Sequence, residues 1–315
     1  MSYLRKEISF PSADGKHTVH GEIYAPQDVK PRGILQISHG MIDYIGRYEA
    51  LAEYLCQRGY IVAGNDHLGH GNTAKSSPDD YGFFAEEGGV ELLLADLNAM
   101  RGELKKLYPS LPLVLMGHSM GSFLSRLYAV KYPESISGHI IHGTGGPMGA
   151  ILPLGKLMVK LNMALFGSRN RSKFIDSLAF SGYNSKFPKS EGHNAWLTRE
   201  LARVDVRDSD EFTTFKFTAS AFYDLFTAIG NSNSAKWFKE YPKNMRTLIM
   251  AGDMDPVGSY GKGPSCVFRK LTEAGAKRVD IKLYPGARHE LFNETDECRL
   301  EAFSDIADWL DATVS

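Results

Sequence analysis

The sequence predicts an α/β protein: a mostly parallel central sheet, flanked by helices and interrupted by one helical insertion. The 315 residues are 43% hydrophobic and 23% charged, as is usual for a soluble folded chain. Short apolar runs bounded by turn residues alternate with longer segments of helical period, which is the pattern of strands and helices in such a sheet. The alternation stops after residue 142 and resumes after about residue 245, which indicates the insertion.

The first elements are strand-rich. Two expected strands, Leu4–Phe10 and Thr18–Tyr24, flank Asp14-Gly15, a dipeptide typical of hairpin turns, so the sheet should begin antiparallel. The alternation of strand and helix then begins. Its first expected elements are the strand Gly33–Ser38, the helix Tyr48–Arg58, the strand Ile61–Asn65 and the helix Val90–Leu107.

The later elements follow the same alternation on both sides of the insertion. Before it we expect the strand Leu113–Met116, the helix Ser122–Val130 and the strand His139–His142. After it we expect the strands Thr247–Met250 and Val279–Tyr284 and the helices Ser265–Ala274 and Glu297–Leu310. A strand–helix–strand crossover needs only about 30 residues, so the intervening segment is far too long for one. We therefore expect a core of residues 1–146 and 236–315 and a helical cap of residues 147–235, called the cap segment below.

Charge and cysteine content exclude several classes of protein. The 36 basic and 37 acidic side chains give a net charge of −1, so no global field draws the chain onto nucleic acid. The three cysteines are odd in number and far apart, which argues against a disulfide framework or a cysteine zinc site. Residues 1–10 carry Arg5, Lys6 and Glu7 where a signal peptide would be apolar, and no apolar run is long enough to span a bilayer. We expect a cytoplasmic protein.

The strongest chemical signal is Gly117-His118-Ser119-Met120-Gly121, a G-x-S-x-G motif between an expected strand and an expected helix. The two glycines suit a sharp turn that leaves no room for side chains beside the serine. Ser119 precedes a helix, whose free N–H groups and positive dipole end favour an oxyanion, so the Met120 N–H is a natural donor to a tetrahedral intermediate.

A serine nucleophile needs a base, and the base needs an orienting carboxylate. Asp253 and Asp255 follow the expected strand Thr247–Met250, and His289 follows the expected strand Val279–Tyr284. Loops at the carboxyl ends of parallel strands gather active sites in open α/β sheets. Spacing alone leaves both aspartates open as the orienting acid.

These motifs resemble those of the α/β-hydrolase superfamily, within the branch of monoacylglycerol lipases, lysophospholipases and serine aminopeptidase-like hydrolases. The resemblance spans essentially the whole chain. It is carried by His39-Gly40-Met41, Arg47-Tyr48, Asp66-His67-Leu68-Gly69-His70-Gly71, the serine motif, Gly252-Asp253-Met254-Asp255 and Tyr284-Pro285-Gly286-Ala287-Arg288-His289-Glu290. It implies an α/β-hydrolase fold in which Ser119 is the nucleophile, His289 the base and Asp255 the acid. It also implies an oxyanion hole formed by the Met41 and Met120 N–H groups.

Several histidines have a structural interpretation that we prefer to a ligand role. His67 and His70 with Asp66 have a metal-like spacing, but a hydrogen-bonded loop after a strand explains them better. The same structural interpretation is preferred for His39, His118, His139 and His142. The acidic-His pair of the resembling branch is replaced here by Asp43-Tyr44. We expect no metal ion and no organic cofactor.

The cap segment contains the expected specificity residues. Leu154, Leu157, Leu161 and Leu165 recur at helical spacing and are candidates to line an acyl pocket. Residues 156–173 include five basic and no acidic side chains. A solvated helix face is the simpler explanation, and transient contact with a lipid surface is the alternative.

The resulting hypothesis is a serine esterase that cleaves acyl esters, most specifically monoacylglycerols or lysophospholipids, through an acyl-enzyme. Its expected partner is a small-molecule ester, with no nucleic acid and no obligate protein partner. One alternative is a proline-type serine aminopeptidase, which needs an acidic subsite for a free amine. The other is a catalytically silent ligand-binding module on the same fold, which has no need for Ser119, Asp255 and His289 together.

Overall fold

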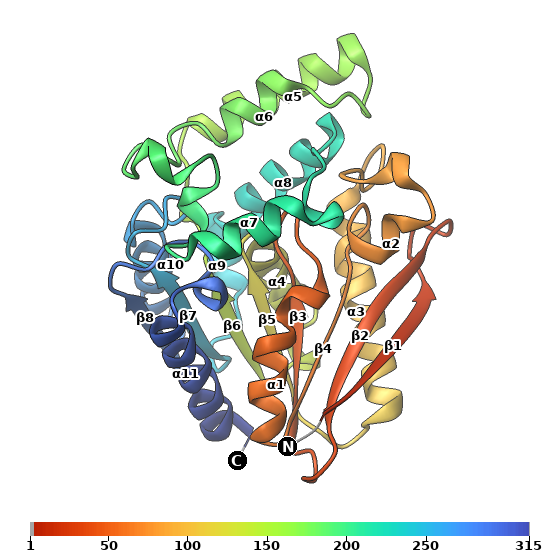
Figure 1. Cartoon of the computed structure of the whole chain (residues 1–315), viewed down its shortest axis with the longest axis vertical. Helices are drawn as coiled ribbons and strands as arrows, with labels where there is room; N and C mark the ends of the chain where they lie inside the picture. The colour runs from red at the N-terminus through yellow and green to blue at the C-terminus, as the bar shows by residue number, and fades with distance from the viewer. Residues whose placement is uncertain (1–2, 315) are drawn as a thin grey trace.

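The computed structural model describes residues 3–314, and its centre is one eight-stranded sheet (Figure 1). The strands lie in the order β1-β2-β4-β3-β5-β6-β7-β8. Their bounds are β1 Tyr3–Pro11, β2 Thr18–Pro26, β3 Gly33–Ser38, β4 Tyr60–Asn65, β5 Leu113–His118, β6 Gly138–His142, β7 Arg246–Gly252 and β8 Val279–Tyr284. β1 pairs antiparallel with β2, β2 pairs antiparallel with β4, and the other neighbours are parallel. The expected antiparallel start and parallel continuation are confirmed.

The helices connect these strands and form the segment between β6 and β7. Their bounds are α1 Glu49–Gln57, α2 Gly71–Lys75, α3 Gly89–Leu107, α4 Met120–Lys131, α5 Ile151–Phe166, α6 Lys173–Ala179, α7 Leu201–Ser209, α8 Ala219–Ser232, α9 Ala235–Glu240, α10 Lys262–Glu273 and α11 Asp296–Val314. Short 3-10 helices are η1 Ile45–Tyr48, η2 Pro78–Asp80, η3 Pro133–Ser135, η4 Lys189–Glu191, η5 Ala195–Leu197, η6 Glu211–Thr213 and η7 Leu291–Asn293.

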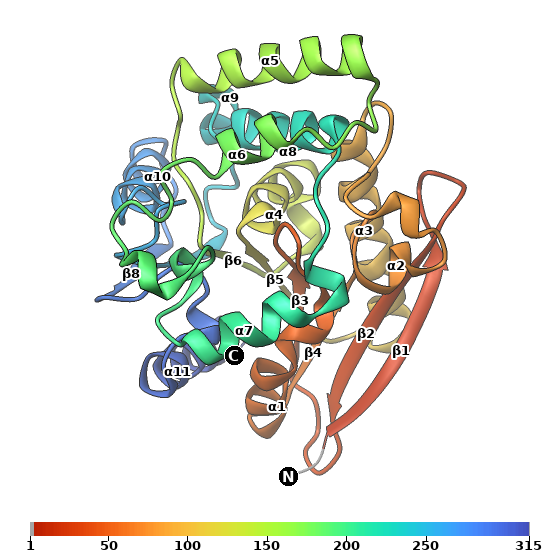
Figure 2. The same ribbon diagram turned by 45° about the horizontal axis from the view of Figure 1, so that its top comes forward.

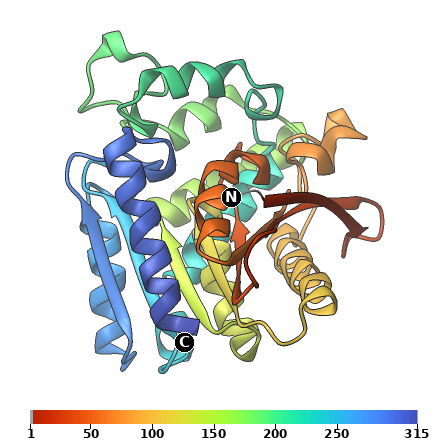
Figure 3. The same ribbon diagram turned by 60° about the horizontal axis from the view of Figure 1, so that its bottom comes forward.

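Each face of the sheet has its own hydrophobic core because successive side chains of a strand point to opposite faces. On β5, Leu113 and Leu115 belong to the core beneath α3 and α4, whereas Val114 and Met116 belong to the core beneath α1 and α11. All four are buried. Figure 3 shows α1 and α11 together on the second face. The inner strands β3, β4 and β5 are therefore buried along their whole length, as expected where helices cover both faces.

Between β6 and β7 the described residues form helices joined by turns and loops, with no strand among them. Figures 1 and 2 place α5, α6, α7 and α8 over the carboxyl ends of the strands. Helix α8 packs on α3 and α4 of the body, and α5 packs on α8. The cap segment therefore covers the edge of the sheet where the sequence-predicted site residues converge.

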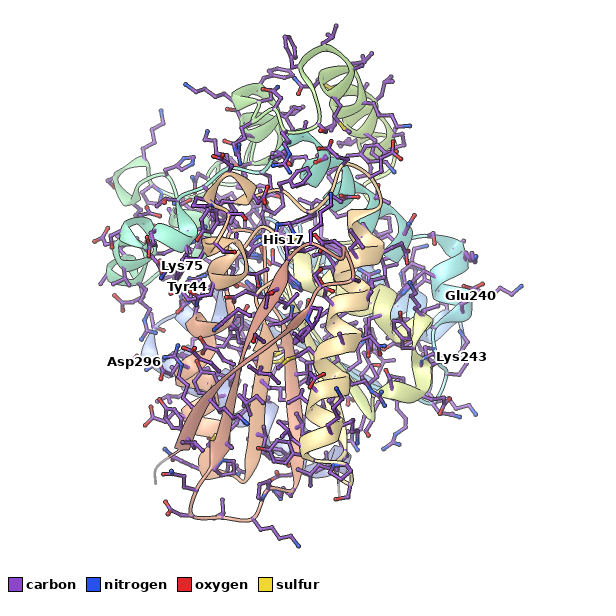
Figure 4. The ribbon with its side chains drawn as sticks, turned by 90° about the vertical axis from the view of Figure 1, so that its right-hand side faces the viewer. His17, Tyr44, Lys75, Glu240, Lys243 and Asp296 are labelled. Carbon is purple, nitrogen blue, oxygen red and sulfur yellow. The ribbon has the colours of Figure 1, made fainter. Side chains whose placement is uncertain are left out.

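The β1–β2 hairpin reaches the cap segment through a chain of charged side chains. His17 lies at the cap-facing end of the hairpin (Figure 4), and its Nε2 is 2.9 Å from Oδ2 of Asp80. The other carboxylate oxygen of Asp80 accepts from Arg169, which lies between α5 and α6, at 2.6 Å. Burial lowers the pKa of His17, but the hydrogen bonds to Asp14 and Asp80 outweigh it and raise the pKa above its usual value. This end of the cap is therefore attached by ion pairs.

Within residues 3–314 no helix is long and apolar enough to cross a membrane.

Candidate active site

Ser119 occupies a strained turn between β5 and α4. Its backbone has φ 53° and ψ −119°, a conformation that residues other than glycine rarely adopt. A Cβ on Gly121 would lie 1.9 Å from the Ser38 carbonyl oxygen, and one on Gly117 would lie 2.2 Å from the Gly121 carbonyl oxygen. Both glycines are thus required by close backbone approach. Strand β5 runs two residues further than expected and α4 begins two residues earlier, so the turn contains Ser119 alone.

His289 and Asp255 form a buried hydrogen-bonded pair. Nδ1 of His289 is 2.9 Å from Oδ2 of Asp255, and both side chains are almost fully buried. The other oxygen of Asp255 accepts from the Val257 N–H at 2.8 Å. Asp253 instead accepts from the Gly286 N–H at 2.7 Å and braces the loop after β8. Of the two acids that spacing left open, Asp255 is the one that contacts the histidine.

Two aromatic rings enclose the imidazole of His289. The ring of His118 lies 4.9 Å away and that of Trp196 lies 5.1 Å away, measured between centroids. The Trp196 carbonyl accepts from the His289 N–H at 3.4 Å, and the Leu197 carbonyl accepts from the Glu290 N–H at 2.7 Å. The cap segment therefore holds the histidine loop directly. Sequence reasoning missed Trp196, because nothing near it in the chain indicates a contact with His289.

The expected oxyanion donors, Met41 and Met120, both line the cavity that contains Ser119. On either side of Met41 the backbone is held: the Gly40 N–H donates to Asp43 at 3.2 Å, and the Ile42 N–H donates to Nε2 of His70 at 3.3 Å. Met120 is the first residue of α4, where backbone N–H groups have no partner within the helix. The backbone around Met41 is thus held in place, and Met120 follows Ser119 at the open end of the helix.

The histidines near the loops after β3 and β4 are buried hydrogen-bonding groups. Nε2 of His39 accepts from the His67 N–H at 2.9 Å, and Nδ1 of His70 lies 3.0 Å from the Leu68 carbonyl. Burial lowers the pKa of His70 to about 4, so its neutral form can accept from Ile42. Asp66 accepts from the Ile45 N–H at 2.9 Å. Within residues 3–314 no group of three potential ligands is placed to hold a metal ion.

A polar cluster lies beside the histidine loop. Arg47 donates to Asp43 at 2.9 Å and to Glu290 at 2.7 Å. Burial raises the pKa of Glu290, but the charge of Arg47 outweighs burial and the pKa falls below its usual value. Tyr48 donates its hydroxyl to Asp43 at 2.8 Å. The buried pair of Arg47 and Glu290 therefore remains ionised.

Ser119 and His289 line one cavity of about 730 Å³. Most of its wall is apolar, and about half of the lining residues belong to the cap segment, including Leu152, Met158 and Phe226. Asp43, Arg207 and Glu290 form a polar end. A cavity with largely apolar walls and a few convergent polar groups is the usual form of a small-molecule site.

The candidate acyl-pocket leucines are only partly in this wall. Leu154 lines the cavity, whereas Leu157, Leu161 and Leu165 are absent from its lining and are 54%, 55% and 74% exposed. The reason is the rotation of α5. Its Val159 is buried, and Gly155 approaches the ring of Phe226 on α8, so the leucine face turns to solvent. The expectation that all four leucines line the pocket is corrected to Leu154 alone.

Comparison with known proteins identifies the family. The model of the family described as serine aminopeptidase S33 matches residues 29–296. The chain belongs to this family. The monoglyceride lipase homolog of monkeypox virus is 27% identical over 89% of this chain and 90% of its own length. The human monoglyceride lipase is 25% identical over 97% of this chain and 93% of its own length.

The solved structures agree with the S33 assignment. A thermostable carboxyl esterase from Bacillus coagulans, solved with glycerol, is 28% identical and superposes with a TM-score of 0.92, with both chains covered completely. The expected α/β-hydrolase fold is confirmed, and so is the enzyme class, a hydrolase of carboxylic esters.

Proposed function

We propose that this protein is a serine hydrolase that cleaves monoacylglycerols or lysophospholipids through an acyl-enzyme on Ser119, His289 and Asp255. One observation supports it above the others: the strained serine turn and the buried His289–Asp255 pair meet in a single, mostly apolar cavity. Relatives named monoglyceride lipases support the glycerol ester.

The chemistry follows from the hydrogen bonds. Asp255 accepts from Nδ1–H of His289, so Nε2 carries the lone pair that removes the proton of Ser119. Oγ of Ser119 attacks the ester carbonyl, and the oxyanion is bound by the Met41 and Met120 N–H groups. His289 then returns the proton to the leaving alcohol. Water, activated by the same histidine, hydrolyses the acyl-enzyme and releases the fatty acid.

The cap segment supplies the acyl site. Leu152, Leu154 and Met158 of α5 and Phe226 of α8 contribute apolar wall, and burial of each acyl methylene contributes up to about 0.8 kcal/mol to binding. In this proposal residues 147–235 act as a cap on a single catalytic core.

Contact with a lipid surface through the cap belongs to the same proposal. Besides Leu157, Leu161 and Leu165, the side chains of Phe166 and Phe174 are more than 60% exposed, which gives α5 and α6 a broad apolar surface outside the cavity lining. Such a surface is unusual on a monomeric soluble protein. Flotation with phospholipid vesicles tests this contact, since the double variant Leu157→Ser, Leu161→Ser should bind more weakly. We also propose that the protein is cytoplasmic, and cell fractionation tests this location.

An aminopeptidase would need a free carboxylate for the substrate amine. Asp43 and Glu290 do line the cavity, but both are already paired with Arg47, and Arg207 adds a second cation beside them. The polar end therefore favours an ester over a peptide with a free amine. A catalytically silent binding module would require neither the strained backbone turn at Ser119 nor the hydrogen-bonded pair of His289 and Asp255.

Labelling with a fluorophosphonate tests the proposal. An activated serine should react stoichiometrically, and mass spectrometry should place the adduct on Ser119. Ser119→Ala should abolish both labelling and hydrolysis of a p-nitrophenyl ester while leaving the melting temperature nearly unchanged. Folded wild-type protein that resists the label, or a Ser119→Ala variant that still turns over the ester, would contradict the assignment.

A further inference from the structure

Arg207 is a cap residue at the polar end of the active-site cavity. It lies on α7 and lines the cavity together with Met41, Ile42 and Glu290. Its side chain is 11% exposed, so an almost buried guanidinium borders the space that substrate would occupy.

The hydrogen bonds of this guanidinium are incomplete. Its buried Nε has no partner within residues 3–314. Nη2 is 3.5 Å from the Ile42 carbonyl, and Nη1 is 3.4 Å from Oδ1 of Asp208, a carboxylate that is 45% exposed. Both distances are at the long limit for a hydrogen bond. Arginine presents five donors, and leaving such donors buried without acceptors is costly, so a ligand with acceptor oxygens would stabilise this end of the cavity.

The carboxylates beside Arg207 already have other donors. Asp43 accepts from four groups, namely the backbone of Gly40 and Tyr44 and the side chains of Arg47 and Tyr48. Glu290 accepts from the side chains of Arg47 and Asn293. Two carboxylates and two arginines make the group neutral overall. A bound anion would therefore meet no net repulsion, and it would not have to break the Arg47 ion pairs to reach Arg207.

The position of Arg207 is that of a leaving-group contact. Figure 2 shows α7 and the α5–α8 pair on opposite sides of the carboxyl ends of β3 and β5. The α5 and α8 side supplies the apolar wall for the acyl chain. His289 protonates the leaving alcohol, so the alcohol must lie close to His289. The next residue in the chain, Glu290, belongs to the polar end of the cavity. The alcohol part of the ester is thus directed to the side where Arg207 lies.

We propose that Arg207 binds an anionic oxygen group, a phosphate or a carboxylate, on the alcohol part of the substrate. The inference rests on the proposed ester hydrolysis and narrows its substrate class to acyl esters of an anionic alcohol. Arginine suits either group because its planar donor fork matches the oxygens of phosphate and carboxylate. Arg207 is then a specificity-determining residue.

Three esters of one fatty acid test this inference: those of glycerol, glycerol 3-phosphate and glyceric acid. Wild-type kcat/KM should be higher for one of the two anionic esters than for the neutral one, and which of them it is distinguishes phosphate from carboxylate. Arg207→Gln should lower the ratio of anionic to neutral efficiency by about ten- to hundred-fold, the range for hydrogen bonds to charged groups. Arg207→Lys should retain part of the preference.

Arg203 provides the matched control. It lies on the same helix, pairs with Asp296 at 2.9 Å and does not line the cavity, so Arg203→Gln removes the same charge elsewhere. That variant should keep the wild-type ratio within about two-fold. Wild-type preference for the glycerol ester, or an equal loss on all three esters in Arg207→Gln, overturns the inference and leaves ester hydrolysis standing. Inactivity toward all esters with Ser119 unlabelled would overturn both.

Discussion

The indole of Trp196 lies against the imidazole of His289, with 5.1 Å between ring centroids. Trp196 belongs to the cap segment, whereas His289 belongs to the loop after β8. The backbone carbonyls of residues 196 and 197 also accept hydrogen bonds from residues 289 and 290. The cap therefore does more than cover the substrate: it fixes the orientation of the proposed base.

Replacing Trp196 should impair catalysis on every ester alike. Trp196→Ala removes one of the two rings that enclose His289, so the imidazole gains freedom and kcat should fall by about ten-fold or more, since small misplacement of a reacting group is costly. Trp196→Phe keeps a ring and should lose much less. Steady-state kinetics with short and long esters check this, and a loss confined to long esters would instead make Trp196 an acyl contact.

The two neighbouring acids after β7 should differ sharply. Asp255→Asn should lower kcat by about 10³- to 10⁴-fold, because an amide favours the wrong imidazole tautomer and does not stabilise the imidazolium. Asp253→Asn is the matched control. Asp253 accepts from the Gly286 N–H and not from the imidazole, so its variant should retain most of the activity. The reverse ranking in steady-state assays would move the orienting role to Asp253.

Local patterns were sufficient for the strands and for the serine turn. The strands β3 and β8 have the predicted bounds, because each is a run with high strand propensity between turn residues. The Ser119 motif also depends on adjacent residues alone. Asp255 was different: two acids two residues apart fit the same loop, so spacing left both open and the choice of Asp255 came from the family resemblance. The structure shows the tertiary contact with His289 that distinguishes Asp255 from Asp253.

The cap was harder to predict in detail. Helical spacing shows which residues of α5 share a face, but this helix has apolar side chains on more than one face. Burial of Val159 and the approach of Gly155 to Phe226 decide which side turns inward. Arg207 and Trp196 come from segments without a motif, and their roles depend on where the cap rests on the body. Such contacts between distant segments leave no periodic signal in the sequence.

Asp224 should make the stability of the protein depend on pH. It lies on α8 of the cap, and burial raises its pKa to about 7, opposed by hydrogen bonds from the Val90 and Gly89 N–H groups at the start of α3. Between about pH 4 and about pH 7 the folded state then binds more protons at this site than the unfolded state does. Its contribution to the free energy of unfolding is therefore complete at low pH and is lost as pH rises through about 7.

Urea unfolding at a series of pH values measures this contribution. Asp224→Asn keeps an acceptor oxygen for the α3 N–H groups but does not titrate, so the difference in stability between wild type and variant should change in favour of the variant as pH rises. A difference that stays constant across this range would show that Asp224 has an ordinary pKa.

Adjacent residues of α5 should differ in their effect on acyl-chain selectivity. Met158 lines the cavity, whereas Leu157 is 54% exposed and lies outside the lining. Met158→Ser should lower kcat/KM for long acyl esters more than for short ones, since each acyl methylene that loses apolar contact forfeits up to about 0.8 kcal/mol, or about four-fold. Leu157→Ser should leave the ratio of long to short efficiencies near that of the wild type.

The comparison must use esters below their aggregation limit, so that binding to a lipid surface does not contribute. Under those conditions the leucine face of α5 has no substrate to contact, and only the inward side chains should affect chain length. If Leu157→Ser lowers the long-chain efficiency as much as Met158→Ser does, α5 must rotate when substrate binds, bringing the exposed leucines into the cavity. Equal losses on short and long esters in Met158→Ser would mean that Met158 only positions the cap.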